Sequence, residues 1–224
     1  DPSLSERLTD PVDRYLANLG HGSGIPSKTL LYGMGSGSSS QLISNSIAFF
    51  SQTGTPNNGG IGLDLANCTF ENPCGPTDFS QTGVSTLNTL LPNTMMYFNG
   101  GSYPAINGFN PITLNNGQGV FSRTANYSAT ANGPARSSFN GGFNLSGNNQ
   151  LDGVILNNTG SAFGVTSTGG SNILINNSQI GSAGNPYISG LSLFDSSATL
   201  TNSVIFSNLF GIQAAQNSTL SIDS

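Results

Sequence analysis

The feature that most constrains the fold is a short motif that recurs about every 25 residues. The stretches "LDGVIL", "INNSQI" and "LTNSVI" begin at Leu151, Ile175 and Leu200. An apolar residue opens and closes each copy, and turn-forming residues occupy the middle. Imperfect repeats of this length, made of short β-rich pieces, are typical of solenoids whose units stack on one shared core.

The third position of this motif holds Gly153, Asn177 and Asn202. Gly and Asn adopt a left-handed backbone at the lowest cost, so this column predicts a bend in each coil. The flanking apolar columns are expected to point into the core. We also expect the stacked Asn side chains to form hydrogen bonds from coil to coil.

A second motif runs in parallel with the first. The stretches "GVTST", "GLSLF" and "GIQAA" begin at Gly164, Gly190 and Gly211. Helical repeats would need long segments with a period of 3.6 residues, and leucine-rich repeats would need a regular L-x-x-L-x-L register. Neither pattern occurs, so the predicted fold class is all-β, a parallel β-helix.

The N-terminal stretch "TDPVDRYLANLG" has a different texture and predicts one short amphipathic helix. Asp10 can cap it, Pro11 suits its first position and Gly20 follows its end. Such a helix can cap the open end of a solenoid or link it to an upstream domain. We therefore expect an N-terminal cap and linker over residues 1–40 and a β-helix over 41–224, with a further coil, a cap or self-association beyond the last repeat.

Residues 83–123 contain strand and turn signals in a regular order. Strands are predicted at Met95–Phe98, Ile112–Leu114 and Val120–Phe121, with turns at "NGG" from Asn99 and "NNG" from Asn115. This order resembles the opening coils of the pectate-lyase-like β-helix superfamily, over about residues 83–224. The resemblance implies that the parallel β-helix is right-handed.

A narrower resemblance comes from four stretches taken together. They are "DPVDRYLANLGHGSGIPSKTL", "ANCTFENPCGPTDF", "MMYFNGGSYPAI" and "FNGGFNLSGNNQLDGVILNN". They look like the bacterial inverse autotransporters of the intimin and invasin type, in a subgroup with a β-helix passenger. The resemblance implies display at the bacterial cell surface or release outside the cell, with Asp1 to about Lys28 following an upstream outer-membrane barrel.

Charge is scarce and its balance is acidic. Charged residues make up 7% of the chain, against roughly 25% in typical soluble domains. Ten Asp and Glu oppose five Lys and Arg, for a net charge of −5. Because phosphate binding needs clustered cations, nucleic acid is not an expected partner. No apolar run approaches the roughly 20 residues of a spanning helix, so we expect no membrane insertion by this segment.

The two cysteines, Cys68 and Cys74, lie six residues apart in "CTFENPC". Pro73 and the short loop favour a disulfide, which indicates an oxidising compartment and an exported protein. Two reduced, buried thiols are the alternative. Only His21 could join them as a further nitrogen or sulfur ligand, so a structural zinc is not expected.

The sequence indicates no catalytic, cofactor-binding or metal-binding residues. Glycoside hydrolysis needs two carboxylates within about 9.5 Å, but Asp152 and Asp195 belong to different columns of the repeat. Arg123 and Arg136 have no acid within ten residues, and Arg136 is expected on a long exposed loop together with Tyr127.

Three function classes follow from these observations. The first is an adhesin-like passenger with a binding or structural role, whose partner would be a host-cell receptor or a glycan. The alternative is a polysaccharide-active lyase or hydrolase on the same scaffold. The third, ice binding, would need a flat face with regular Thr-x-Thr ranks, and only "TST", Thr166 to Thr168, matches that pattern.

Overall fold

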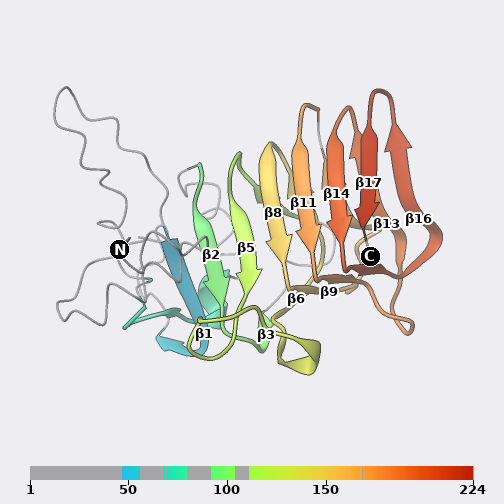
Figure 1. Ribbon diagram of the computed structural model, residues 1–224. Coiled ribbons are helices and arrows are strands. Elements are labelled where there is room, and N and C mark those ends of the chain that lie inside the picture. The colour runs from blue at the N-terminus through green and yellow to red at the C-terminus, as the bar shows by residue number, and fades with distance from the viewer. Residues whose placement is uncertain are drawn as a thin grey trace, which may run out of the picture.

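The computed structural model describes residues 47–55, 68, 70–79, 92–103, 111–167 and 169–223. Over these residues the chain forms a parallel β-solenoid of about five turns, which confirms the predicted fold class (Figure 1). The expected N-terminal helix, the domain boundary at residue 40 and His21 lie outside the described residues.

Three parallel sheets run along the solenoid. Sheet A consists of β1 (Ile47–Thr55), β2 (Met95–Phe98), β5 (Gly119–Ser122), β8 (Asn148–Asp152), β11 (Asn172–Asn176), β14 (Ser197–Thr201) and β17 (Thr219–Asp223). Sheet B consists of β3 (Ser102–Tyr103), β6 (Ser138–Asn140), β9 (Ile155–Asn157), β12 (Gln179–Ile180) and β15 (Val204–Ile205). Sheet C consists of β4 (Ile112–Leu114), β7 (Phe143–Leu145), β10 (Phe163–Ser167), β13 (Tyr187–Phe194) and β16 (Ser207–Ala215).

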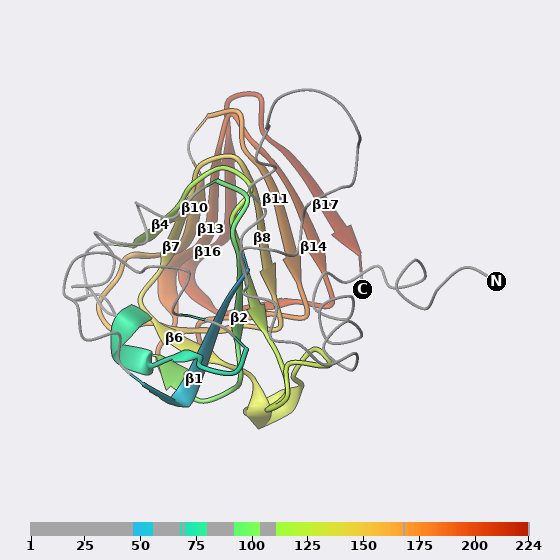
Figure 2. The same cartoon turned by 90° about the vertical axis from the view of Figure 1, so that its left-hand side faces the viewer.

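From β2 onward, each described coil runs through the sheets in the order A, B, C before the next coil begins. Viewed along the stack, sheets A and C form two long walls that converge, and the short strands of sheet B cross the base (Figure 2). Among the described residues, two 3-10 helices lie in the connections, η1 (Pro76–Phe79) and η2 (Gly133–Ala135). The predicted strands Met95–Phe98 and Ile112–Leu114 have the predicted bounds, and β5 extends one residue further at each end than predicted.

The strand register places the two repeat motifs in stacked columns. Leu151 pairs with Ile175, and Ile175 pairs with Leu200, all three buried in the core. In sheet C, Val165 pairs with Leu191, which in turn pairs with Ile212. The glycines that precede these residues therefore form a column of their own.

This glycine column exists because the corner between sheets B and C has no room for a side chain. A Cβ on Gly190 would lie 2.0 Å from Cγ2 of Ile205 and 2.8 Å from the carbonyl oxygen of Gly211. A Cβ on Gly164 would lie 2.4 Å from Cγ2 of Ile180. Isoleucines of sheet B thus fill the space that the glycines leave open.

All three residues of the bend column adopt a left-handed backbone. Their φ angles are 69° at Gly153, 46° at Asn177 and 48° at Asn202. The coil-to-coil side-chain bonds differ from the expected Asn ladder, because the serine after each Asn makes them. The Ser203 hydroxyl accepts a bond of 3.1 Å from the backbone N–H of Ser178.

The Ser178 hydroxyl repeats this contact one coil earlier, accepting a bond of 3.2 Å from the N–H of Val154. Asn177 instead donates its side-chain N–H to the amide oxygen of Asn132, 3.0 Å away in the connection between β5 and β6. A serine hydroxyl can accept from one coil while donating to a carbonyl, so it suits a tight corner better than a longer amide.

The core changes in character along the stack. In the first coils it is aromatic, with the rings of Phe50 and Phe98 stacked at 4.5 Å and Phe79 packed edge-on against Phe98 at 4.8 Å. From β8 onward sheet A contributes aliphatic side chains such as Leu151 and Ile173. One continuous cluster spans both parts.

A second apolar layer covers the outside of sheet A in the first coils. Its buried members are Ile47, Phe49, Tyr97, Phe121 and Tyr127, with Phe70 and Met95 packed against them. The predicted disulfide between Cys68 and Cys74 is formed, with 4.8 Å between the Cα atoms. It holds Phe70 beside this layer, and the carbonyl oxygen of Cys68 accepts a bond of 3.0 Å from the N–H of Phe49.

Candidate functional site

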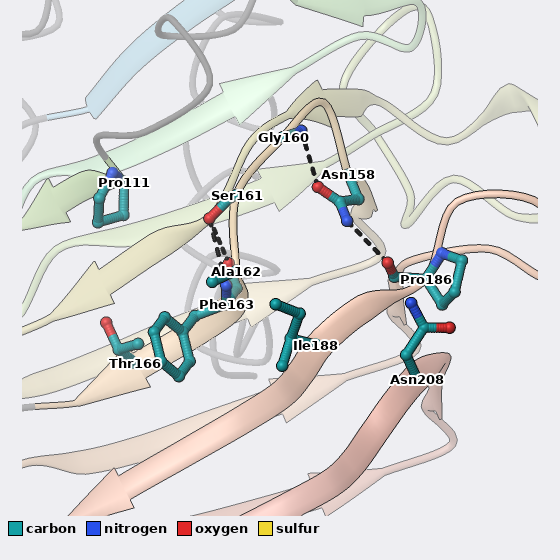
Figure 3. A pocket seen from close by; sticks show the side chains of 10 residues that line it. All are labelled: Pro111, Asn158, Gly160, Ser161, Ala162, Phe163, Thr166, Pro186, Ile188 and Asn208. Atoms are coloured by element: carbon teal, nitrogen blue, oxygen red, sulfur yellow. Dashed lines mark hydrogen bonds between the residues drawn. The ribbon is translucent and has the colours of Figure 1, made fainter.

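An open pocket lies on the outer face of sheet C, at the corner where the chain arrives from sheet B (Figure 3). Its volume is about 530 Å³. The residues that line it are Pro111, Asn158, Gly160, Ser161, Ala162, Phe163, Thr166, Pro186, Ile188 and Asn208. They come from the coils of β4, β10, β13 and β16, so the pocket depends on the stacking of the solenoid. We call it the sheet C pocket.

Two large apolar side chains are exposed in this pocket. Phe163, at the start of β10, is 43% exposed, and Ile188, near the start of β13, is 50% exposed. Figure 3 shows the two side chains next to each other on neighbouring strands. Each stands shortly before a glycine of the glycine column, where the inward space is already filled. These side chains therefore face solvent, and burying them against a ligand would be favourable.

Hydrogen bonds hold the pocket wall in shape. The side-chain amide of Asn158 donates to the carbonyl oxygen of Pro186 at 2.7 Å and accepts from the N–H of Gly160 at 2.9 Å. The Ser161 hydroxyl donates to the carbonyl oxygen of Phe163 at 2.8 Å. One amide thus ties the β9–β10 connection to the β12–β13 connection, which sets the position of Phe163 before any ligand binds.

Further hydrogen-bonding groups stand at the rim. Thr166 donates its hydroxyl to the amide oxygen of Asn144 at 3.2 Å and keeps acceptor capacity. Asn208, at the exposed edge of β16, has no hydrogen-bond partner for its amide within the part of the chain that the structure describes. An amide offers two donors and an acceptor, a set that suits hydroxyl groups.

The pocket carries no charge, because none of its lining residues is ionisable. Asp152 and Asp195, the two acids considered as a possible catalytic pair, lie outside the pocket. Asp152 is buried at the end of β8 in sheet A, and Asp195 is exposed in the turn between β13 and β14. The structure does not bring a pair of carboxylates into the pocket.

Arg123 forms an ion pair that the sequence did not predict. It has no acid within ten residues, yet its Nη1 lies 2.7 Å from Oδ2 of Asp152, and both side chains are buried. The pair forms because β5 and β8 are neighbours in sheet A, although 29 residues separate the two side chains. The guanidinium also lies over the rings of Tyr97 and Phe121, at 5.3 and 5.0 Å from their centroids.

Tyr127 is likewise not the exposed loop residue that the sequence suggested. Its ring is buried in the second layer, and its hydroxyl donates to the carbonyl oxygen of Phe50 at 2.8 Å. Burial raises the pKa of the Tyr127 phenol far above its ordinary value. Arg136 donates to the carbonyl oxygen of Asn177 at 3.0 Å. The 124–136 connection therefore folds back onto sheet A instead of projecting from it.

Thr166 belongs to a column of mixed composition. The register of sheet C stacks Thr113, Asn144, Thr166, Ser192 and Gln213 in successive coils. Ice binding was expected to require regular ranks of Thr, and this column does not provide one. It provides a line of uncharged hydrogen-bonding groups instead.

The sequence contains a weak signal for the pocket. In "SAFGV" and "YISGL" a large apolar residue precedes the glycine of the second motif, close to a tight chain reversal. The repeat accounts for the glycine, but it does not predict that the apolar residue before it lies in the core. An unassigned apolar residue beside a repeat motif therefore points to an exposed contact.

Comparison with models of known protein families finds no match, and comparisons with curated proteins and with solved structures find none either. Within the described ranges, no helix is long and apolar enough to cross a membrane. The same residues hold no group of three His, Cys, Asp or Glu that could bind a metal ion. The assignment of the fold as a parallel β-solenoid therefore depends on the strand pairing and the core of this structure. The relation to inverse autotransporters stays a prediction.

Proposed function

We propose that this chain is a recognition domain of the adhesin type, displayed at the bacterial surface or secreted, whose sheet C pocket binds an uncharged glycan. The observation that carries the proposal is the pocket itself. It combines the exposed Phe163 and Ile188 with uncharged amides and hydroxyls, on a scaffold that fixes their positions. Binding sites typically join an apolar lining to a few placed polar groups.

A neutral sugar presents the two chemistries that this pocket offers. Its C–H faces can pack on Phe163 and Ile188, and its hydroxyls can bond to side chains such as Asn208 and Thr166. No cation lines the pocket to pair with a carboxylate or sulfate, and the chain carries a net charge of −5. These charges disfavour acidic glycans.

Export is supported by the disulfide, because such bonds persist in oxidising compartments. The stacked coils supply a stiff support for a contact surface, which suits a passenger on an upstream outer-membrane barrel. The proposal that this chain belongs to the inverse autotransporters depends on the sequence resemblance alone. Protease accessibility of the protein on intact cells, with the Cys68–Cys74 bond oxidised, would support it, and free thiols in a cytoplasmic fraction would refute it.

The binding proposal can be tested with the purified chain on a panel of neutral and acidic glycans. We expect neutral glycans to bind, and Phe163→Ala to weaken the best of them about tenfold, equivalent to about 1.4 kcal/mol. The matched control is Phe194→Ala, because Phe194 is 48% exposed in the same sheet but outside the pocket.

Affinity should be unchanged in Phe194→Ala. Equal losses in the two variants, or a panel on which only acidic glycans bind, would overturn the proposal. Turnover of a bound glycan would replace the binding role with the enzyme alternative.

A further inference from the structure

The exposed apolar residues of the sheet C pocket continue beyond it. Leu209, in β16, is 67% exposed and does not line the pocket. The register shifts between β13 and β16, since Tyr187 pairs with Ser207 while Ser189 pairs with Phe210. Asn208 and Leu209 therefore lie together opposite Ile188. Bulges of this kind are common where a side chain is re-aimed beside a binding site.

The three side chains form a staggered line on neighbouring strands, because Phe163 pairs with Ser189, one residue beyond Ile188. Phe163, Ile188 and Leu209 stand near the start of the sheet C strands in three successive coils, and all three are exposed. We call this line the apolar ladder. Neighbouring strands in a sheet are about 4.8 Å apart, so the ladder offers one apolar contact at each such step.

A polar column runs beside the apolar ladder. Thr166, Ser192 and Gln213 occupy equivalent positions in the same three strands, further along each one. A ligand lying along the solenoid would meet an apolar contact and a hydrogen-bonding group in each coil. None of these six side chains carries a charge.

From this arrangement we infer that the sheet C pocket is one end of an elongated site, which takes an extended, uncharged glycan chain along the solenoid axis with successive sugar units on successive coils. A single sugar fills the pocket between Phe163 and Ile188. The next units pass Asn208 and Leu209. A linear polymer suits such a site because its repeat is comparable in length with the coil spacing. The inference rests on the proposed glycan-binding function and adds the ligand's shape and direction.

The test is a length series measured by calorimetry with the purified chain. The probes are β-1,4-linked glucose oligomers of one to five units, with β-1,4-linked N-acetylglucosamine oligomers as a second series. We expect affinity to rise about tenfold between one and three units and then to level off, equivalent to about 1.4 kcal/mol. Leu209→Ser should remove most of that rise and leave the single-unit affinity unchanged.

Phe163→Ala, in contrast, should weaken binding at every length. The control is Val204→Ser, because Val204 is an exposed apolar residue of the same coil, 53% against 67% for Leu209, but lies in sheet B. It should bind the whole series as the unchanged protein does. Because Leu209 and Val204 are both largely exposed, neither substitution removes core packing, and a circular dichroism spectrum checks that each variant is folded.

The outcomes separate the two proposals. Binding without length dependence, or an equal effect of Leu209→Ser at all lengths, overturns the elongated site and leaves glycan binding in place. Absence of binding in both series and on the glycan panel overturns the proposed function. A dimer in sedimentation that Leu209→Ser dissociates would mean that a second copy covers the apolar ladder, which also overturns the elongated site.

Discussion

The first and last coils share one backbone plan but differ in how many layers they bury. In sheet A the outward column reads Phe49, Tyr97 and Phe121 in the first strands. It continues as Asp152, Asn176 and Thr201 in the later ones. The aromatic part is covered by the 124–136 connection and by the disulfide loop. In the polar part Asp152 is still buried against Arg123, whereas Asn176 and Thr201, in the open coils, are half-buried. The residue type at a given position of this solenoid therefore depends on what covers that coil, and not on the repeat alone.

The change of character occurs at one ion pair. Arg123 directly follows β5, the last strand with an outward aromatic residue, and forms an ion pair with Asp152, the first polar residue of the outward column. Its guanidinium lies over the last two aromatic rings, and Asp152 also accepts a bond of 2.9 Å from the side chain of Asn176. The pair joins the covered coils to the open ones.

Removing the acid of this pair should produce the largest effect. Asp152→Ala leaves the Arg123 charge buried without its partner, which typically costs about 3–5 kcal/mol. We expect a loss of that order in the free energy of unfolding, measured by urea denaturation. Asp195→Asn, which removes the charge of an exposed acid and keeps a residue that tolerates the left-handed backbone there (φ 47°), is the control and should change stability by less than about 0.5 kcal/mol. Similar losses in the two variants would show that the junction does not couple the coils.

The disulfide should matter less, and mainly to the covered coils. Cys68→Ser with Cys74→Ser opens a short loop, for an expected loss of about 2–3 kcal/mol. Hydrogen exchange should then quicken in β1, against which the loop packs, and in β2, which pairs with β1, while β11 and β14 keep their protection. Uniformly faster exchange along the stack would mean that the two regions unfold as one unit.

The sequence was sufficient for the plan of the open coils but not for the second layer. The motif around Gly153, Asn177 and Asn202 reveals coil spacing and bends because nothing else constrains those coils. The outer layer depends on Tyr127 folding back over β1, a contact between residues 77 positions apart. No local pattern encodes such a contact, and low charge around Arg123 even suggested an unpaired cation.

The candidate site was hidden for a related reason. Periodicity identifies residues that repeat, whereas the sheet C pocket uses the side chains that interrupt the repeat, such as Phe163 and Ile188. Their proximity follows from the strand register, which can be derived once the coils are aligned. The bulge beside Leu209 adds a residue that alignment of the glycines alone does not place.

A substitution in the glycine column tests the open coils directly. Gly190→Ala places a methyl group against Ile205 and the backbone of Gly211, and overpacking of this kind costs about 1–3 kcal/mol. Gly184→Ala is the control, because a Cβ there would have no neighbour within 4 Å. Thermal unfolding followed by circular dichroism should separate the two variants. If Gly190→Ala were as stable as the control, the corner would be looser than its contacts indicate.

High pH should act more on the covered coils than on the open ones. Burial raises the pKa values of Tyr103, Tyr127 and Tyr187 well above the ordinary value of 10, and the first two lie in the covered coils. Above pH 10 the unfolded chain releases these protons while the folded chain keeps them. Stability is therefore fully present below pH 10 and falls above it, by about 1.4 kcal/mol per pH unit for each tyrosine.

Urea denaturation between pH 9 and pH 11 measures this slope. Tyr127→Phe should reduce the loss of stability per pH unit by the contribution of one tyrosine. Near neutral pH the same variant should lose about 1 kcal/mol of stability, because the hydrogen bond to Phe50 is absent. An unchanged slope in this variant would show that Tyr127 ionises freely in the folded protein.

The smallest expected effect concerns the bend column and distinguishes backbone strain from side-chain bonding. Asn177 has a φ of 46°, and its side-chain amide donates a bond of 3.0 Å to Asn132, with a longer contact of 3.5 Å to the carbonyl oxygen of Ala131. Asn177→Ala should cost about 1 kcal/mol, because alanine adopts a left-handed backbone at greater cost than asparagine. Asn177→Gly loses the same bond but tolerates that backbone, as Gly153 does in the preceding coil, so its stability should stay close to that of the unchanged protein. If both variants lost stability equally, the amide contact with Asn132 would be the cause, and the open coils would depend on a covering loop as the first coils do.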